Sequence, residues 1–183
     1  MNSPSRRDVL KGIGGAGALA LGGVGAASAA GRGRRQGASA ENDLVQIAEG
    51  AGLSILVDAA TRANLAGTLS GNRQLTVFAP TNSAFENLLA NTPYESLDDI
   101  PLKILRNILL YHVTSGRRYA ASVVNAPQIK MLNGGTVRVN GTRLNGGGLG
   151  GANITETNNV EASNGVAHVI DGVLLPPSVL EML

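Results

Sequence analysis

The chain has 183 residues, with 15 Lys and Arg against 13 Asp and Glu, and it contains no cysteine. The absence of cysteine excludes disulfide bonds, iron–sulfur clusters and metal sites built on thiolates. Aromatic residues are scarce, with two Phe, three Tyr and no Trp, which argues against a stacking platform for sugars or for single-stranded nucleic acid.

The N-terminus carries the features of an export signal. The stretch "SRRDVLK", which contains Arg6 and Arg7, resembles a twin-arginine motif, and a run of 20 uncharged, glycine-rich residues follows it at 12–31. Ala27 and Ala29 form a small-residue A-x-A site for a signal peptidase. We expect residues 1–29 to be a cleaved twin-arginine signal that sends the protein to the cell envelope or outside the cell. A retained membrane anchor is the alternative.

Removal of the signal changes the charge balance. Residues 30–183 carry 12 basic and 12 acidic side chains, and Arg32, Arg34 and Arg35 lie in a Gly- and Ser-rich stretch. We expect 30–41 to be a flexible basic linker and 42–183 to be a single domain with one core. Without the three linker arginines the net charge is −3, so no basic face for nucleic acid is expected.

The first half of the domain has helical periodicity interrupted by one strand. Residues 42–69 predict two helices broken near Gly50–Gly52. The stretch 74–80, "QLTVFAP", predicts a short strand with Leu75, Val77 and Ala79 on one apolar face, stopped by Pro80. Ser83–Glu86 has the S-x-x-E form of a capping box and predicts a helix start. A further helix is expected from Pro101, with one stripe made of Leu102, Leu105, Leu109 and His112.

From residue 119 onward the pattern changes to strands. Asn-Gly pairs at 133–134, 140–141, 145–146 and 164–165 predict tight turns, because Asn and Gly tolerate positive φ. Val137 and Val139 alternate with polar residues, which is typical of a half-buried strand. Residues 178–183 predict a closing helical turn. Helices followed by strands predict an α+β domain with an antiparallel or mixed sheet.

Three stretches together resemble the fasciclin (FAS1) family. The first is "LTVFAPTNSAFENLL" at 75–89, the second is the Tyr-His pair in "NILLYHVTSG", and the third is "VEASNGVAHVIDGVLLPP" at 160–177. The residues that carry the resemblance are Thr81, Asn82, Phe85, Tyr111, His112, Asn164, Gly165, His168 and Asp171.

The resemblance implies a wedge-shaped β-sandwich of about seven strands with several helices packed on one side. It also implies an extracellular or cell-envelope module for adhesion or matrix association, not an enzyme. The stretch 144–159 is longer and richer in glycine than the usual hairpin of the family, and we expect the hairpin tip of this stretch to be flexible.

The candidate chemical groups favour structural roles. His112 and His168 lack further metal ligands beyond carboxylates, and His168 and Asp171 stand three apart on a strand, on opposite faces. We therefore expect each histidine to be half buried and hydrogen-bonded, and Asn82 to cap a helix. No catalytic, metal or cofactor residue is predicted.

Two functions follow as hypotheses. The first is an exported, non-enzymatic module that binds a cell-surface or matrix protein or polymer, with membrane contact only through an uncleaved signal. The alternative is an extracellular carrier of a small apolar ligand, such as a lipid or pigment. Nucleic acid is not an expected partner, and a homodimer stays open.

Overall fold

The computed structural model describes residues 42–155 and 160–182. The expected export signal, with Arg6, Arg7, Ala27 and Ala29, and the expected linker at 30–41 lie outside the described residues. Within the described ranges, no helix has the length and apolar character needed to span a bilayer.

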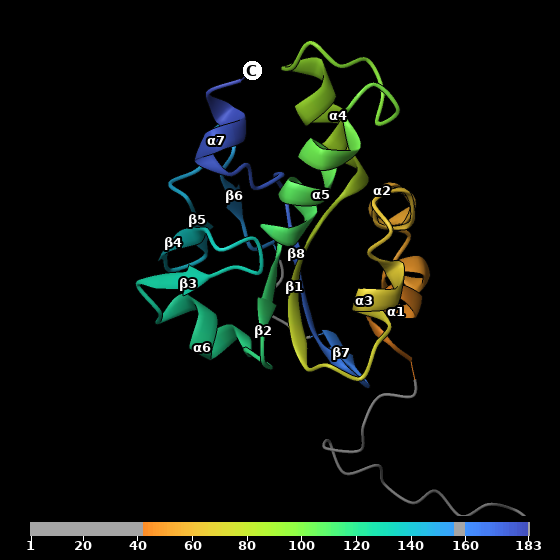
Figure 1. Cartoon of the computed structure of the whole chain (residues 1–183). Coiled ribbons are helices and arrows are strands. Elements are labelled where there is room, and N and C mark those ends of the chain that lie inside the picture. Colours follow the sequence, from red (N-terminus) through yellow and green to blue (C-terminus); the bar gives the residue numbers. More distant parts are fainter. Residues whose placement is uncertain (1–41, 156–159, 183) are drawn as a thin grey trace, which may run out of the picture. The chain divides into compact units, whose positions relative to one another are not determined.

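Eight strands in the described residues form two four-stranded sheets (Figure 1). The first sheet has the order β2 (Val113–Ser115), β1 (Leu75–Pro80), β8 (Gly165–Ile170), β7 (Val160–Ala162). The second has the order β3 (Gln128–Lys130), β4 (Thr136–Asn140), β5 (Arg143–Leu144), β6 (Ala152–Asn153). The first sheet is mixed and the second is antiparallel throughout, which confirms the α+β class.

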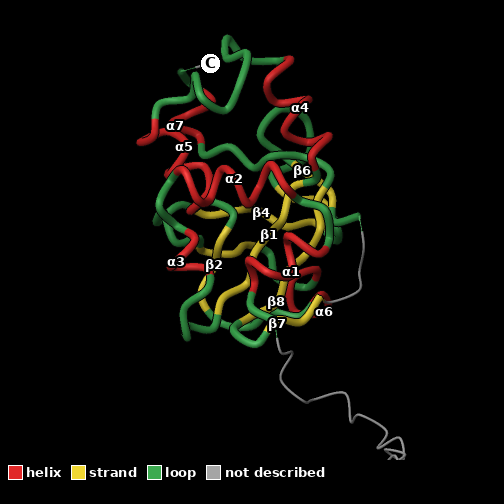
Figure 2. Tube along the Cα trace, turned by 90° about the vertical axis from the view of Figure 1, so that its right-hand side faces the viewer, coloured by secondary structure: helices red, strands yellow, loops and turns green. Residues whose placement is uncertain are grey.

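Seven helices accompany the sheets in the described part of the chain. They are α1 (Leu44–Gly50), α2 (Ser54–Arg62), α3 (Ala66–Leu69), α4 (Asn82–Ala90), α5 (Leu102–Leu110), α6 (Ala120–Val124) and α7 (Pro177–Leu180). Figure 2 looks onto α1, α2 and α3, which lie in front of the strands of the first sheet. The two helices expected over 42–69 are therefore three, and the break falls at Gly52, whose φ is +73°.

The strand β1 is buried on both faces, whereas the sequence pattern predicted one apolar face. All six of its residues are buried, because helices cover one face of the sheet and the second sheet covers the other. Its neighbour β8 runs parallel to it, from Leu75 opposite Gly165 to Pro80 opposite Ile170. Such central parallel strands are expected to be apolar on both sides. Pro80 belongs to the strand as its last residue.

Two apolar cores separate the layers. The helices pack on the first sheet through residues such as Leu56, Phe85 and Leu105. The two sheets pack face to face through a second core, to which the first sheet contributes Phe78 and Ile170. The second sheet contributes Ile129, Val137 and Leu144 to the same core. This arrangement confirms a sandwich with helices on one side.

The segment after residue 119 is not purely β. Residues Ala120–Val124 form α6, and Val123 is fully buried against the core between the sheets. A helix of five residues has too few positions to show a helical period in sequence, and it is stabilised here by tertiary packing.

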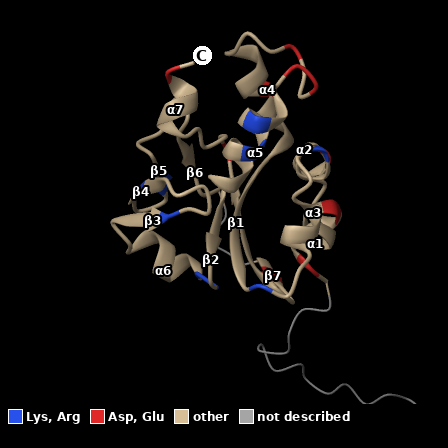
Figure 3. Cartoon of the chain, viewed as in Figure 1, with Lys and Arg blue, Asp and Glu red and all other residues tan. Residues whose placement is uncertain are grey.

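Charged side chains are unevenly distributed over the domain (Figure 3). Acidic groups gather over α1, the loop before α5 and the C-terminal end, whereas the region of β3, β4, β5 and α6 shows only Lys and Arg.

Candidate functional site

We call the three stretches that resemble the fasciclin family signatures. The first signature, 75–89, forms a helix cap and a link between helices. Thr81, and not Ser83, is the N-cap of α4, since its side-chain oxygen accepts a hydrogen bond from Ala84 N at 3.3 Å. Asn82 is therefore not the cap; its side chain accepts from Ile55 N at 3.3 Å and donates to the carbonyl of Gly52 at 3.1 Å. It ties the start of α2 to α4. Phe85 is 1% exposed and fills the core under the helices.

The Tyr-His pair connects α5 to both sheets. The Tyr111 hydroxyl donates to the carbonyl of Thr136 at 2.8 Å and accepts from Asn145 Nδ2 at 3.2 Å. The Nε2 atom of His112 accepts from Leu174 N at 2.9 Å, so Nδ1 carries the proton and donates to the Ile108 carbonyl at 2.8 Å. His112 thus joins the end of α5 to the segment after β8.

The third signature, 160–177, connects the first sheet to α1 and to β6. Asn164 accepts from Leu44 N at 3.0 Å through its side-chain oxygen, and its amide donates to the carbonyl of Gly71 at 2.8 Å. The Asp171 carboxylate accepts from Asn153 N at 2.6 Å and from the Asn153 side-chain amide at 2.9 Å. The first contact holds α1 on the sheet, and the second joins the end of β8 to β6.

His168 lies in the centre of β8 and is fully buried, not half buried as expected. Its Nε2 atom donates to the carbonyl of Arg118 at 2.7 Å, and Nδ1 has no partner among the described residues. Burial lowers the pKa of His168, and the hydrogen bond to Arg118 opposes this shift. The ring is 5.8 Å from that of Phe78.

Burial also governs the chemistry of His112, which is 1% exposed. Desolvation lowers its pKa to about 4, and the hydrogen bond to Ile108 opposes the shift. The two histidines of the chain are therefore neutral at pH 7, buried and held by backbone partners. Among the described residues, no group of three His, Cys, Asp or Glu side chains is placed to hold a metal ion.

Two anchoring residues escaped sequence analysis. Asn145 has a φ of +51°, and its side chain accepts from Arg138 N at 3.0 Å while donating to Tyr111 Oη. It fixes the start of the glycine-rich loop between β5 and β6, and the Asn-Gly pair predicted only the turn. Arg117 donates to the carbonyls of Ala162 and Ser163 at 2.8 and 2.7 Å, so it clamps the turn before β8.

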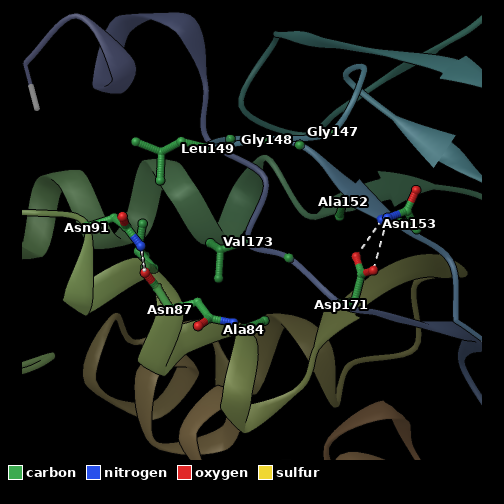
Figure 4. A pocket seen from close by; sticks show the side chains of 14 residues that line it. Ala84, Asn87, Asn91, Gly147, Gly148, Leu149, Ala152, Asn153, Asp171 and Val173 are labelled. Atoms are coloured by element: carbon green, nitrogen blue, oxygen red, sulfur yellow. Dashed lines mark hydrogen bonds between the residues drawn. The ribbon is translucent and has the colours of Figure 1, made fainter.

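The glycine-rich loop borders a polar cleft of about 330 Å³ (Figure 4). The loop residues Gly147–Gly151 form one wall, and the other is formed by α4 with Asn87 and by its C-cap residue Asn91. Asp171 and Asn153, joined by their hydrogen bonds, close one end. Leu149 stands at the rim and is 49% exposed. The cleft therefore offers amide, carboxylate and backbone groups at the surface.

An apolar groove lies between the first sheet and the helices α1 and α2. All of its lining residues are apolar, and they come from α1, α2, the end of α3, β1, β7, β8 and the segments that join the first two helices. Its volume is about 30 Å³, which is room for about one water molecule.

Comparison with known proteins places these features in a family. Residues 51–176 match the fasciclin domain. Protein sll1483 of Synechocystis sp. is 39% identical over 144 residues, which cover 73% of this chain and 73% of that protein. The cell surface glycolipoprotein MPB83 of Mycobacterium bovis is 35% identical over 115 residues, which cover 63% of this chain and 49% of MPB83, so the chain spans about half the length of that relative.

Among solved structures, a FAS1 domain pair from the insect cell adhesion molecule fasciclin I has a TM-score of 0.41 and 23% identity, over 70% of this chain and 43% of that chain. The family match covers more than half of the sequence, and the match to sll1483 covers nearly three quarters of both chains. The chain therefore belongs to the fasciclin domain family.

Proposed function

We propose that the protein is exported by the twin-arginine route and acts as a non-enzymatic module for adhesion or surface association. The relative MPB83 carries the name of a cell surface glycolipoprotein, which supports a location at the cell surface or outside the cell. The polar groups of the signature residues support the same role, because they bind neighbouring segments of the fold; the carboxylate of Asp171, which lines the cleft, is held by the backbone and side chain of Asn153.

The observation that carries the proposal is the glycine-rich loop. Asn145 anchors the loop, the 330 Å³ cleft opens beside it, and Leu149 projects from it into solvent. An anchored loop with an exposed apolar tip is suited to contact a protein or polymer, since buried apolar anchors supply much of the binding energy at interfaces.

Leu149→Asp is expected to reduce retention of the full-length protein on envelope material from its source cell by about tenfold. A charge at this tip removes apolar contact and requires desolvation on binding, which is of the order of 1.4 kcal/mol. Retention is measured by sedimentation of the protein with isolated envelopes.

Leu102→Asp is the matched control, since Leu102 is 54% exposed at the start of α5 and lines neither the cleft nor the apolar groove. We expect this variant to be retained like the wild type. Equal retention of both variants and the wild type would show that the loop tip is not a contact, and absence of any retention would contradict the proposed function.

The second candidate function is the transport of a small apolar ligand. The groove lined wholly by apolar residues favours it, but lipid-sized pockets hold several hundred cubic ångströms, so α1 and α2 have to move away from β7 and β8 to admit a ligand. If this function holds, the full-length protein isolated from its native source releases an apolar compound in near-equal molar amount on solvent extraction, as seen by mass spectrometry. Protein that is colourless and free of extractable compound contradicts the carrier function.

A further inference from the structure

The charges of the chain are separated along the sequence and in space. Residues 100–155 contain seven Lys or Arg and no Asp or Glu. Residues 42–99 contain seven Asp or Glu and only Arg62 and Arg73 as cations. A net charge taken over the whole domain hides this separation, which is why the sequence predicted no basic face.

Three of these cations lie on the outward face of the second sheet. Lys130, Arg138 and Arg143 are exposed, while their strand neighbours Ile129, Val137 and Leu144 point into the core. The outward face is thus polar, and the ribbon of β3, β4 and β5 carries blue and no red segments in Figure 3.

The strand register puts the three cations in one diagonal row. Lys130 is opposite Thr136, two residues before Arg138, and Arg143 is opposite Asn140, two residues after Arg138. Diagonal neighbours in an antiparallel sheet are roughly 7–8 Å apart. The row therefore crosses β3, β4 and β5 with evenly spaced positive charge.

Uncharged polar side chains fill the spaces beside the row. Gln128 lies directly opposite Arg138, and Thr136 and Asn140 point to the same face. Two open depressions, of about 420 and 450 Å³, flank Arg138 and share Gln128, Arg138 and Asn145 in their walls. The Arg138 guanidinium has no hydrogen-bond or ion-pair partner among the described residues, so it is free to meet an anion.

We infer that this face, defined by Lys130, Arg138, Arg143, Gln128 and Asn140, binds an acidic polysaccharide, a chain of sugars that bear carboxylate groups. The guanidinium of Arg138 matches a carboxylate in bidentate geometry, and the amides beside it match the hydroxyl groups between the charges. This inference rests on the proposed role in surface association and names the class of partner.

Other anionic partners fit the face less well. The face has only three cations and none of its outward residues is aromatic, whereas nucleic-acid grooves combine dense positive charge with stacking. A membrane surface is disfavoured because the outward residues of β3, β4 and β5 include no large apolar side chain that could enter the bilayer interface. The exposed Leu149 and Leu180 line only one of the two depressions beside Arg138.

The test compares the full-length protein with two triple variants of equal net charge. Lys130→Gln/Arg138→Gln/Arg143→Gln removes the row, and Arg73→Gln/Lys103→Gln/Arg106→Gln removes three exposed cations elsewhere. Polygalacturonate is the acidic probe, and its fully methyl-esterified form is the neutral one. Binding is measured by isothermal titration calorimetry at low and high salt.

We expect the wild type to bind polygalacturonate and not the ester, with an affinity that falls as salt screens the charges. The row variant is expected to lose at least tenfold in affinity, and the control variant to stay within about twofold. Equal losses in both variants, binding of the ester, or stronger binding to double-stranded DNA or to phosphatidylglycerol vesicles would each overturn the inference.

The two proposals fail separately. If envelope retention depends on Leu149 but the protein does not bind polygalacturonate, only the inference of an acidic polysaccharide partner is wrong. If the protein binds polygalacturonate through the row but is not retained on envelopes, the proposed function is wrong.

Discussion

Gly165→Ala is expected to lower the free energy of unfolding by about 3 kcal/mol or more. A Cβ at position 165 would overlap the carbonyl oxygen of Leu75 and lie 2.9 Å from Leu44 Cδ1. The first of these neighbours is backbone of the adjacent central strand, so relief requires β1 and β8 to separate at the end where their pairing begins. Urea unfolding followed by circular dichroism measures the change.

Gly67→Ala is the control for the chemical change itself. Gly67 lies in α3, and an added Cβ meets no atom within 4 Å. Alanine is the better helix former by about 1 kcal/mol, so this variant is expected to be as stable as the wild type or slightly more stable. A Gly165→Ala protein with unchanged stability would mean that the two central strands do not approach as closely as the structure shows.

His112→Phe is expected to cost about 2–4 kcal/mol of stability although it keeps a ring of similar size. The substitution removes the acceptor of Leu174 N and the donor to the Ile108 carbonyl. Ile108 keeps a second partner in Tyr111 N, but Leu174 N is left buried without its acceptor. An unsatisfied buried N–H costs about 1–3 kcal/mol.

His168→Phe is the matched comparison within the same core. This histidine makes one hydrogen bond and already buries an unpartnered Nδ1, so its replacement removes one unfavourable group along with one favourable contact. We expect a loss of about 1 kcal/mol or less. A larger loss of stability for His168→Phe than for His112→Phe would contradict the role of His112 in joining the end of α5 to the segment after β8.

Burial of His112 also makes the stability of the protein depend on pH. Its pKa of about 4 in the folded protein is below the ordinary 6.5, so the unfolded chain takes up the proton first as pH falls. The contribution of neutral His112 to the free energy of unfolding is complete above pH 6.5 and is lost as the pH falls toward 4. From pH 7 to pH 5 the wild type is expected to lose about 2 kcal/mol through His112, and His112→Phe is expected to lack this part of the slope.

The sequence predicted those helices, strands and turns whose pattern is contained within a few neighbouring residues. The helix after Pro101, the strand at 74–80 and the turns at Asn133 and Asn140 all depend on periodicity or on backbone freedom, and the structure has them. The stripe expected on that helix is only partly found, because Leu105 and Leu109 are buried, whereas Leu102 is exposed and His112 lies beyond the end of α5. The start of α4 was misplaced by two residues, because Thr81 and Ser83 can both cap and only the strand end at Pro80 decides between them.

Contacts between distant segments were beyond local patterns. Asn82 was expected to cap its own helix, but its side chain reaches residues 52 and 55, which no local motif encodes. Burial of His168 depends on β8 becoming a central strand, and that follows from its pairing with β1. Burial of His112 depends on its contact with the segment after β8, where Leu174 N donates to its ring. The basic row was also hidden, because it arises only when the register aligns three strands.

The parallel pairing of β1 with β8 has a consequence for how the chain acquires its structure. The paired residues are separated by about 90 positions in sequence, and closing so long a loop costs entropy before any contact compensates for it. The central sheet therefore cannot form during synthesis until β8 and thus nearly all of the domain has left the ribosome. Until then, the apolar residues of the segments made earlier stay exposed to solvent. A slow, late-forming nucleus is the expected kinetic signature of this topology.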